Sequence, residues 1–273
     1  MTDSSTTIKP ASFLYEERGP VAVITFDRAD RLNSLTFEVY RELTDTLAKL
    51  RDREQVRVVV ITGRGRGFCS GGDVDDIIGE LFNRDMNGLL EFTRMTCELI
   101  ANIRALHKPV IASLNGTVAG AGAVIAVACD LRIASNTAKI AFLFTRVGLA
   151  GADMGAGFLL PRVIGLSKAT ELLYTGDFIS AAEAERIGLY NKVVDARELE
   201  AETSRWAQRL ADGPGFALGM TKASLNRELQ MSLEAALEAE AQTQAICMLN
   251  PDFREAYQSF KEKRAPVFNN RKV

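Results

Sequence analysis

Two runs of this chain are predominantly apolar, VRVVVITG at 56–63 and PVIASLNG at 109–116. A strand with one wet face alternates apolar and polar residues, whereas a wholly apolar strand is typical of a parallel sheet covered on both faces. A segment with helical spacing, 87–105, lies between the two runs. Strand, helix and strand in this order predict an α/β fold with helical crossovers.

The remainder of the chain divides into two parts. Further strands are expected within 13–26, 131–135 and 191–194, and further helices within 36–50, 119–130, 166–175 and 181–187. From Leu199 onward the pattern is almost entirely helical. We therefore expect an α/β core over 1–198 and a C-terminal helical region over 199–273.

Charge and hydropathy exclude several classes of partner. The 33 Lys and Arg nearly balance the 35 Asp and Glu, so no basic surplus favours nucleic acid. No run approaches the roughly 18 apolar residues of a membrane span, and residues 1–13 lack the apolar stretch of a leader peptide. We expect a cytoplasmic protein with no nucleic-acid or membrane partner.

The cysteines and the single histidine disfavour metal and triad chemistry. The four cysteines are scattered without a C-x-x-C pair, and His107 is the only histidine. A Cys/His metal site and a Ser-His-Asp triad both need more ligands or partners than this. We expect no metal and no separate cofactor.

Two glycine-rich segments follow the apolar runs. The first, GRGRGFCSGGD at 63–73, can bring backbone N–H groups close to a ligand, or can simply be a tight turn. The second contains Gly120 and Gly122 at the expected start of a helix, where free amides and a positive dipole meet. Close helix packing is its alternative interpretation, and Ile125 stands where a dinucleotide fingerprint needs glycine.

A third segment, GLAGADMGAG at 148–157, holds one acid, Asp153, among small and apolar residues. The carboxylate could cap the following helix or could move a proton. Two amide donors from separate loops and one proton carrier are the minimum needed to stabilise an enolate.

Several motifs together resemble the enoyl-CoA hydratase/isomerase (crotonase) superfamily. The matching stretches occur in that family's order and include VAVITFDRADRLNSLT, VRVVVITGRGRGFCSGGDV, KPVIASLNGTVAGAGAVIAVACDLRIAS and FREAYQSFKEKRAPVF. The resemblance implies a spiral of β-β-α repeats and a C-terminal helical trimerisation region. It also implies a homotrimer or dimer of trimers, and a coenzyme A thioester as substrate.

The same resemblance assigns site residues. Gly72 and Ala121 match the two positions whose amides hold the thioester oxygen. Arg31 and Leu32 match the edge of the family's coenzyme A site, and Ser70, Gly71, Asp73 and Val74 match the stretch at its adenine. Phe260 and Lys263 match residues of the C-terminal tail. In the family this tail often reaches the nucleotide end of coenzyme A from a neighbouring subunit.

The catalytic acids of the family's hydratases are absent. Their two glutamates match Val124 and Phe144 here. Hydration needs a base for the water and an acid for the α-carbon, which neither side chain can supply. Both residues would instead line a dry acyl pocket.

Asp153 therefore becomes the candidate acid/base. Its loop resembles that of dienoyl-CoA isomerases and some ring-opening members, with one extra residue in the alignment. Burial in a dry pocket would raise the pKa of its carboxyl. The rival acids Asp73, Asp75 and Asp76 are expected in a solvated loop and helix start.

We expect an enzyme of the hydratase or isomerase type. A hydrolase or C–C lyase acting on a cyclic or aromatic-derived 3-oxoacyl-CoA is an alternative, because the apolar lining suits a ring. A non-catalytic coenzyme A-binding homologue is the third interpretation.

Overall fold

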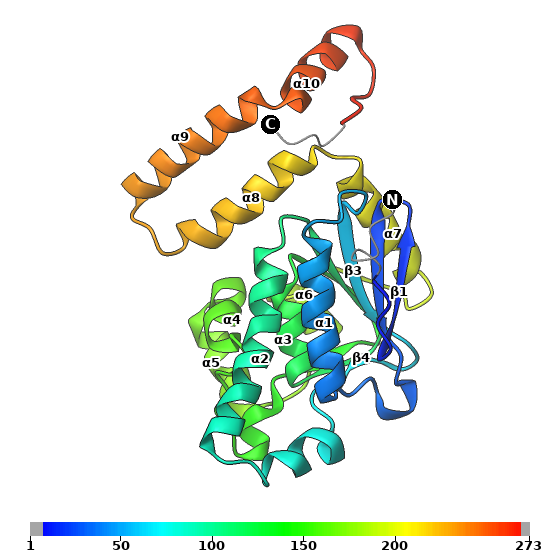
Figure 1. The fold of residues 1–273 in the computed structure, drawn as a ribbon, viewed down its shortest axis with the longest axis vertical. Coiled ribbons are helices and arrows are strands. Elements are labelled where there is room, and N and C mark those ends of the chain that lie inside the picture. Colours follow the sequence, from blue (N-terminus) through cyan, green and yellow to red (C-terminus); the bar gives the residue numbers. More distant parts are fainter. Residues whose placement is uncertain (1–7, 269–273) are drawn as a thin grey trace, which may run out of the picture.

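The computed structural model describes residues 8–268. Part of the segment expected to lack a leader peptide, residues 1–7, and the end of the helical region, residues 269–273, lie outside the described residues. The main sheet has six strands in the order β1-β2-β3-β5-β7-β10 (Figure 1). Its strands are β1 (Phe13–Arg18), β2 (Val21–Phe26), β3 (Val58–Gly63), β5 (Val110–Leu114), β7 (Leu131–Ser135) and β10 (Lys192–Val194). Only the β1–β2 pair is antiparallel.

A second, smaller sheet accompanies the first. Its order is β4-β6-β8-β9, with β4 (Gly67–Cys69), β6 (Thr117–Ala119), β8 (Lys139–Ala141) and β9 (Ile179–Ser180). Three strands of the main sheet, β3, β5 and β7, are each followed directly by one strand of this sheet and then by helical structure. The expected spiral of β-β-α repeats is therefore confirmed.

Glycines allow the chain to pass between the two sheets. A Cβ on Gly63 would lie 2.4 Å from the Gly67 carbonyl oxygen, and one on Gly116 would lie 2.1 Å from the Arg66 carbonyl oxygen. Neither distance is compatible with a side chain, because the obstacle is backbone. These crossings fix where each strand of the second sheet begins.

Helices cover both faces of the main sheet. The inner helices are α1 (Phe37–Leu50), α2 (Met86–Ala105), α3 (Ala121–Ala128), α4 (Ala156–Ile164), α5 (Leu166–Thr175) and α6 (Ala181–Arg186). The other face carries α7 (Leu199–Ala211), which packs on β3, β5 and β7. Helix α7 follows the boundary expected at 198/199, yet its packing places it with the α/β core.

The last three helices project from the core (Figure 1). They are α8 (Gly215–Glu228), α9 (Leu233–Leu249) and α10 (Pro251–Glu262). Helix α8 is tied down by buried Lys222, whose Nζ lies 2.9 Å from the Ile103 carbonyl oxygen and 2.8 Å from Asp130 Oδ2. Asp130 also accepts a hydrogen bond from Val110 N, so it joins the turn before β7 to the start of β5.

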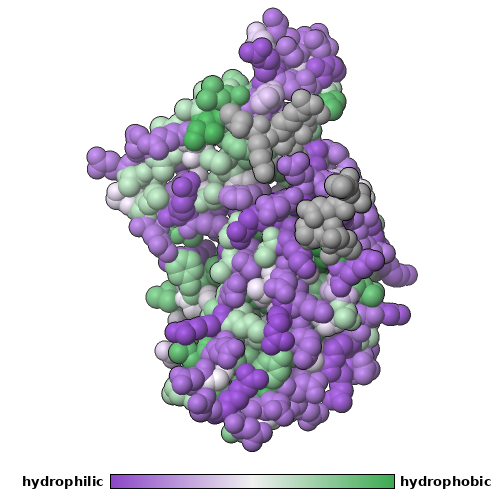
Figure 2. All heavy atoms as spheres, in the orientation of Figure 1, coloured by the Kyte–Doolittle hydropathy of each residue, from purple (hydrophilic) through white to green (hydrophobic). Residues whose placement is uncertain are grey.

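Apolar side chains are exposed on the projecting helices. Figure 2 shows green atoms gathered over α8 and α9 among hydrophilic ones. The exposed apolar residues of this region include Leu225, Leu229, Leu233, Leu237, Ile246, Met248, Leu249, Phe253, Tyr257 and Phe260. Within residues 8–268, no helix has both the length and the apolar character needed to cross a bilayer.

Candidate active site

The two glycine-rich segments come together at the start of α3. Gly71 and Gly120 both have positive φ, +102° and +51°, which disfavours any side chain there. A Cβ on Gly71 would lie 3.4 Å from Ala121 N, and one on Gly122 would lie 2.5 Å from the Cys69 carbonyl oxygen. The segments around residues 70 and 120 are thus in backbone contact.

This contact places two unused N–H groups near each other. Leu35 N donates to the Gly71 carbonyl and Asp73 N donates to the Leu35 carbonyl, so the groups flanking Gly72 are occupied. The Gly72 N–H itself donates to none of the described residues, and neither does the N–H of Ala121, the first residue of α3. The first amides of a helix have no partner within it and carry the positive end of its dipole. The pair can therefore bind an oxygen that gains negative charge.

The edge residues expected around coenzyme A also meet. The Leu32 carbonyl accepts a hydrogen bond from Ser70 N at 3.0 Å, and Ser70 Oγ donates to the Arg31 carbonyl at 3.4 Å. The exposed Arg31 guanidinium pairs with Asp75 at 3.4 Å. Val74 is also exposed, 69% of its surface being accessible. Four of the predicted binding positions, at 31, 32, 70 and 71, thus form one continuous rim beside Gly72.

Asp73 serves the loop itself. Its Oδ1 accepts from the backbone N–H groups of Asp75 and Asp76, which holds the helical turn Val74–Gly79. Its Oδ2 accepts from Ser34 Oγ at 2.7 Å and pairs with Arg28 at 3.2 Å. The Ser34 hydrogen bond, the two backbone amides and the Arg28 charge lower the pKa of this buried carboxyl to about 2. Asp73 is therefore an ionised structural group. The expectation that it is solvated is wrong, because Ser34, Arg28 and the loop amides enclose it, and its contact with coenzyme A stays a prediction.

The two positions matched to the hydratase glutamates lie in the apolar interior. Val124 is fully buried in α3, and Phe144 is 8% exposed in the helical turn Leu143–Val147. Neither can accept or donate a proton, as expected from the sequence.

Asp153 lies in the loop before α4 and does not cap that helix. The N-cap position belongs to Gly155, while Asp153 Oδ1 accepts from the neighbouring Met154 N at 2.8 Å. A Cβ on Gly155 would lie 3.7 Å from Ile100 of α2, so this loop packs on that helix. Asp153 is half-buried, and burial raises the pKa of its carboxyl.

The Asp153 charge reaches two further helices. Burial raises the pKa of the Tyr40 hydroxyl in α1 and of the Cys97 thiol in α2, and the negative charge of Asp153 adds to both shifts. The carboxylate is therefore close enough to α1 and α2 to act on groups of both helices. The helix-cap interpretation of Asp153 is wrong, and the expected rise in pKa is confirmed in direction.

Two tail residues do not join the site within one chain. Phe260 is 84% exposed on α10, and Lys263 ends that helix in the left-handed conformation. Helix α10 packs mainly on α9. Their predicted contact with coenzyme A thus stays a prediction.

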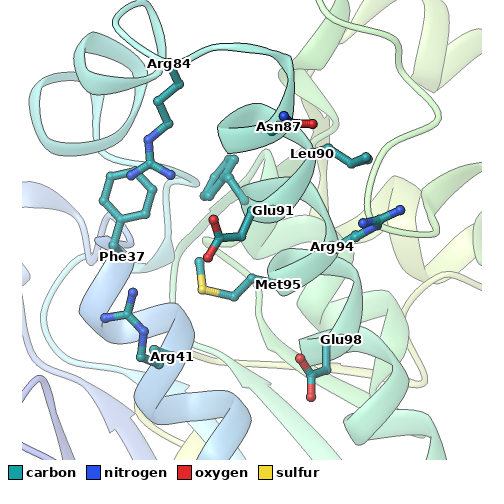
Figure 3. A pocket seen from close by; sticks show the side chains of 10 residues that line it. Phe37, Arg41, Arg84, Asn87, Leu90, Glu91, Arg94, Met95 and Glu98 are labelled. Carbon is teal, nitrogen blue, oxygen red and sulfur yellow. The ribbon is translucent and has the colours of Figure 1, made fainter.

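A cavity of about 490 Å³ opens between α1 and α2, and neither Gly72 nor Ala121 lines it (Figure 3). The Arg84 guanidinium lies over the Phe37 ring, 4.3 Å from its centre. The lining residues are Phe37, Arg41, Arg84, Asn87, Leu90, Glu91, Phe92, Arg94, Met95 and Glu98. Across the part of the chain with defined structure, no three His, Cys, Asp or Glu side chains are placed to hold a metal ion.

Comparison with known proteins identifies the family. The enoyl-CoA hydratase/isomerase family model matches residues 16–271. A probable enoyl-CoA hydratase of Mycobacterium bovis is 38% identical, over 93% of this chain and 90% of that protein. The 1,2-epoxyphenylacetyl-CoA isomerase of Escherichia coli is 35% identical, over 93% of this chain and 97% of that protein. The crystal structure of a putative enoyl-CoA hydratase from Streptomyces coelicolor A3(2) superimposes with a TM-score of 0.96 at 48% identity, covering 99% and 98% of the two chains. The chain therefore belongs to the enoyl-CoA hydratase/isomerase family of the crotonase superfamily.

Proposed function

We propose that this enzyme shifts a double bond in an acyl-CoA thioester by proton transfer and does not use the two-glutamate hydration of its family. The observation that carries the proposal is a contrast between the polar groups that are present and the acids that are absent. The amides of Gly72 and Ala121 donate to none of the described residues, and burial raises the pKa of the half-buried Asp153 carboxyl. Valine and phenylalanine occupy the positions matched to the water-activating acids.

The amide pair would act on the thioester oxygen. When a proton leaves the carbon chain, the electron pair of the broken C–H bond moves through the conjugated system onto that oxygen. Hydrogen bonds from Gly72 N–H and Ala121 N–H become stronger as the oxygen becomes negative, which stabilises the enolate more than the ground state. The dipole of α3 adds to this preference.

Asp153 would carry the proton. Its ionised carboxylate takes the proton from the α- or γ-carbon, and the resulting acid returns it to the other carbon. The double bond moves, the enolate collapses to the thioester, and no water is consumed. A carboxyl whose pKa is raised by burial is a stronger base than an ordinary aspartate, which favours the first step.

The names of the relatives leave room for this chemistry. A protein called an isomerase, from Escherichia coli, is about as similar to this chain as one called a probable hydratase. Family membership alone therefore does not select hydration. Hydrolysis or C–C cleavage of a 3-oxoacyl-CoA, and coenzyme A binding without catalysis, stay as outcomes that the test must separate.

The test is the isosteric Asp153→Asn variant, assayed with crotonyl-CoA, a 2,4-dienoyl-CoA and a cyclic 3-oxoacyl-CoA. We expect wild type to isomerise the dienoyl substrate, and the variant to lose about 10²- to 10⁴-fold in kcat, the usual contribution of a general acid/base. Asp75→Asn is the matched control, because Asp75 is an exposed acid paired with Arg31 at the rim, and it should change kcat by no more than a few-fold.

Unchanged turnover in a folded Asp153→Asn protein would remove Asp153 from the chemistry. Efficient conversion of crotonyl-CoA by wild type would instead show hydration, and turnover of the cyclic substrate alone would favour hydrolysis or cleavage. Tight coenzyme A binding without turnover of any thioester would favour the non-catalytic homologue.

The projecting helices support a second part of the proposal, self-association. The apolar residues on α9 and α10, Leu237, Ile246 and Phe253 among them, are more exposed than an isolated chain normally leaves them. A homotrimer or dimer of trimers would cover them, and would let Phe260 and Lys263 of one subunit reach a neighbour's nucleotide end. Light scattering should give a mass of three or six chains, and Leu237→Glu should lower it; a monomeric wild type would contradict this.

A further inference from the structure

The four consecutive backbone N–H groups from Ser70 to Asp73 are not equivalent. Three of them have a partner within the protein. Ser70 N donates to the Leu32 carbonyl at 3.0 Å, Gly71 N to Cys69 Sγ at 3.4 Å and Asp73 N to the Leu35 carbonyl at 2.9 Å. The N–H of Gly72 donates to none of the described residues. The loop therefore fixes each of these donors except the one proposed to bind the thioester oxygen.

Two of the three partners belong to one short segment, residues 32–35. Besides accepting from Asp73 N, Leu35 donates its own N–H to the Gly71 carbonyl at 2.8 Å, so it is bonded to the residues on both sides of Gly72. The position of segment 32–35 therefore sets the direction in which the Gly72 N–H points.

Segment 32–35 has an unusual backbone. Leu32 and Asn33 are consecutive non-glycine residues in the left-handed region, with φ of +50° and +58°. Asparagine adopts this region more readily than most residues, whereas leucine rarely does. A conformation of this kind persists only where surrounding contacts hold it. The segment therefore needs an anchor.

The anchor is the side chain of Asn33, which is 1% exposed. Its Nδ2 donates to the Gly67 carbonyl at 2.7 Å and to the Arg64 carbonyl at 3.0 Å, and its Oδ1 accepts from Arg28 N at 2.9 Å. Both N–H groups and the oxygen of the amide are thus used. Gly67 begins β4, the strand that leads directly into the loop of the amide donor. Asn33 therefore joins its own segment to that strand.

We infer that Asn33 is a positioning residue for catalysis: by fixing segment 32–35, its amide directs the N–H of Gly72 at the thioester oxygen. Asn33 acts through the backbone hydrogen bonds of Leu32 and Leu35 and needs no contact with the substrate. The inference rests on the proposed function in one point, that the Gly72 N–H is a donor to that oxygen.

The physical basis is the directionality of hydrogen bonds. An N–H···O bond weakens steeply as its angle closes, and a preorganised donor stabilises a developing charge without having to move. Without the Asn33 amide, Leu32 is free to leave the left-handed region, and the bonds from its segment to the loop 70–73 lose their fixed origin. The start of β4 keeps a second anchor, because Asn115 Nδ2 also donates to the Gly67 carbonyl, at 3.0 Å. Loss of the Asn33 amide should therefore misdirect one donor without unfolding the strand.

Cinnamoyl-CoA tests the inference without turnover, because its acyl group has no saturated carbon to which a double bond can shift. A hydrogen bond to the thioester oxygen polarises the conjugated chain and moves its absorption to longer wavelength, so the spectrum at saturating enzyme reports on the donors. We expect a red shift with wild type, and one smaller by about half or more in Asn33→Gly and Asn33→Asp, since one of two donors is misdirected. With a substrate that wild type turns over, kcat should fall roughly ten- to a hundredfold, while KM changes by no more than a few-fold.

The two variants remove the anchor in different ways. Aspartate keeps the shape of asparagine and the acceptor for Arg28 N, but places an oxygen against the carbonyls of Arg64 and Gly67. Glycine keeps the left-handed backbone available and adds no charge. Asn33→Gly therefore carries the test if Asn33→Asp does not fold.

Asn115→Asp is the matched control. Asn115 also makes three hydrogen bonds to residues 63–67, accepting from one backbone N–H and donating to two carbonyls, but none of those three reaches segment 32–35 or the loop 70–73. It should keep the wild-type red shift. An equal loss in this control would overturn the inference, by showing that any weakening of the chain before β4 has the same effect.

Two further results would overturn the inference: a wild-type spectrum without a red shift, or a full red shift in folded Asn33→Gly. Because cinnamoyl-CoA undergoes no proton shift, these outcomes are independent of whether Asp153→Asn changes kcat.

Discussion

The proposed oxyanion hole and the proposed acid/base site are built in opposite ways. The hole consists of backbone N–H groups, and its position is set by contacts in which Gly71 and Gly122 leave no room for a Cβ. The acid is one side chain on a loop, held by a hydrogen bond from Met154 N and by packing on α2. Under the proposed function, the donors of the hole cannot change position unless the backbone moves, whereas a side-chain acid can be supplied by a different element. The proposal therefore allows Val124 and Phe144 to stand at the positions matched to the acids while the amide pair is kept.

The largest effect expected from a change in the hole comes from breaking the backbone contact. Gly122→Ala puts a methyl group where its Cβ would lie 2.5 Å from the Cys69 carbonyl oxygen, so α3 and the end of β4 must separate. The two donors then no longer converge. We expect a loss of about 10²- to 10³-fold in kcat, as for removal of an oxyanion-hole donor, measured with the thioester that wild type turns over fastest.

Gly79→Ala is the control for this substitution. The nearest atom to its added Cβ is 3.7 Å away, an ordinary contact, and the residue is exposed. Its kcat should stay within a few-fold of wild type. A Gly122→Ala enzyme with full turnover would show that the close approach at α3 does not position the donors.

A smaller effect, on folding stability, distinguishes Asp73 from Asp153. Asp73 has a pKa lowered to about 2 by its hydrogen bonds and by Arg28, so its ionised form stabilises the folded state. This contribution is present above the ordinary pKa near 3.8 and is lost as the pH falls toward 2. Asp73→Asn should therefore lower the free energy of unfolding at pH 7 by on the order of 2 kcal/mol, seen in urea unfolding, while kcat changes little.

Sequence reasoning identified the long elements and missed the short ones. The five- and six-residue strands of the main sheet and the helices between Phe37 and Ala105 have enough residues for a period to be read, and they were confirmed. The three-residue β10 was also expected, whereas β4, β6 and β9, with two or three residues each, are too short for any period and were missed. Strands β4 and β6 form where the glycine crossings after β3 and β5 turn the chain onto a second sheet.

The site was predictable where it depends on backbone and unpredictable where it depends on side-chain direction. Glycines that permit positive φ or close approach can be recognised in a sequence, and the structure brings the two glycine-rich segments into backbone contact. The resemblance assigned Gly72 and Ala121 within them, and their role as a pair of donors stays a prediction. The direction of a side chain cannot be read in the same way, because a spacing of three or four residues gives only the face of a helix on which a residue lies. The role of Asp73 in its own loop also needed coordinates, since Ser34 and Arg28 come from a different segment.

The smallest and most discriminating effect is the pH dependence of Asp153. Its carboxyl must be ionised to accept a proton, so kcat should fall about tenfold for each pH unit below its pKa. Because burial raises this pKa, the fall should begin at a higher pH than it would for an ordinary aspartate. The sign for stability is opposite to that of Asp73: a raised folded-state pKa favours the folded state at low pH, and this contribution is lost as the pH rises through that value. Asp153→Asn should accordingly keep or raise the Tm at pH 7, whereas Asp73→Asn lowers it. The residual kcat of Asp153→Asn should no longer fall at acidic pH. If Asp153→Asn instead lowers the Tm as much as Asp73→Asn does, both carboxylates are structural, and the contrast between a fixed hole and a separate acid fails.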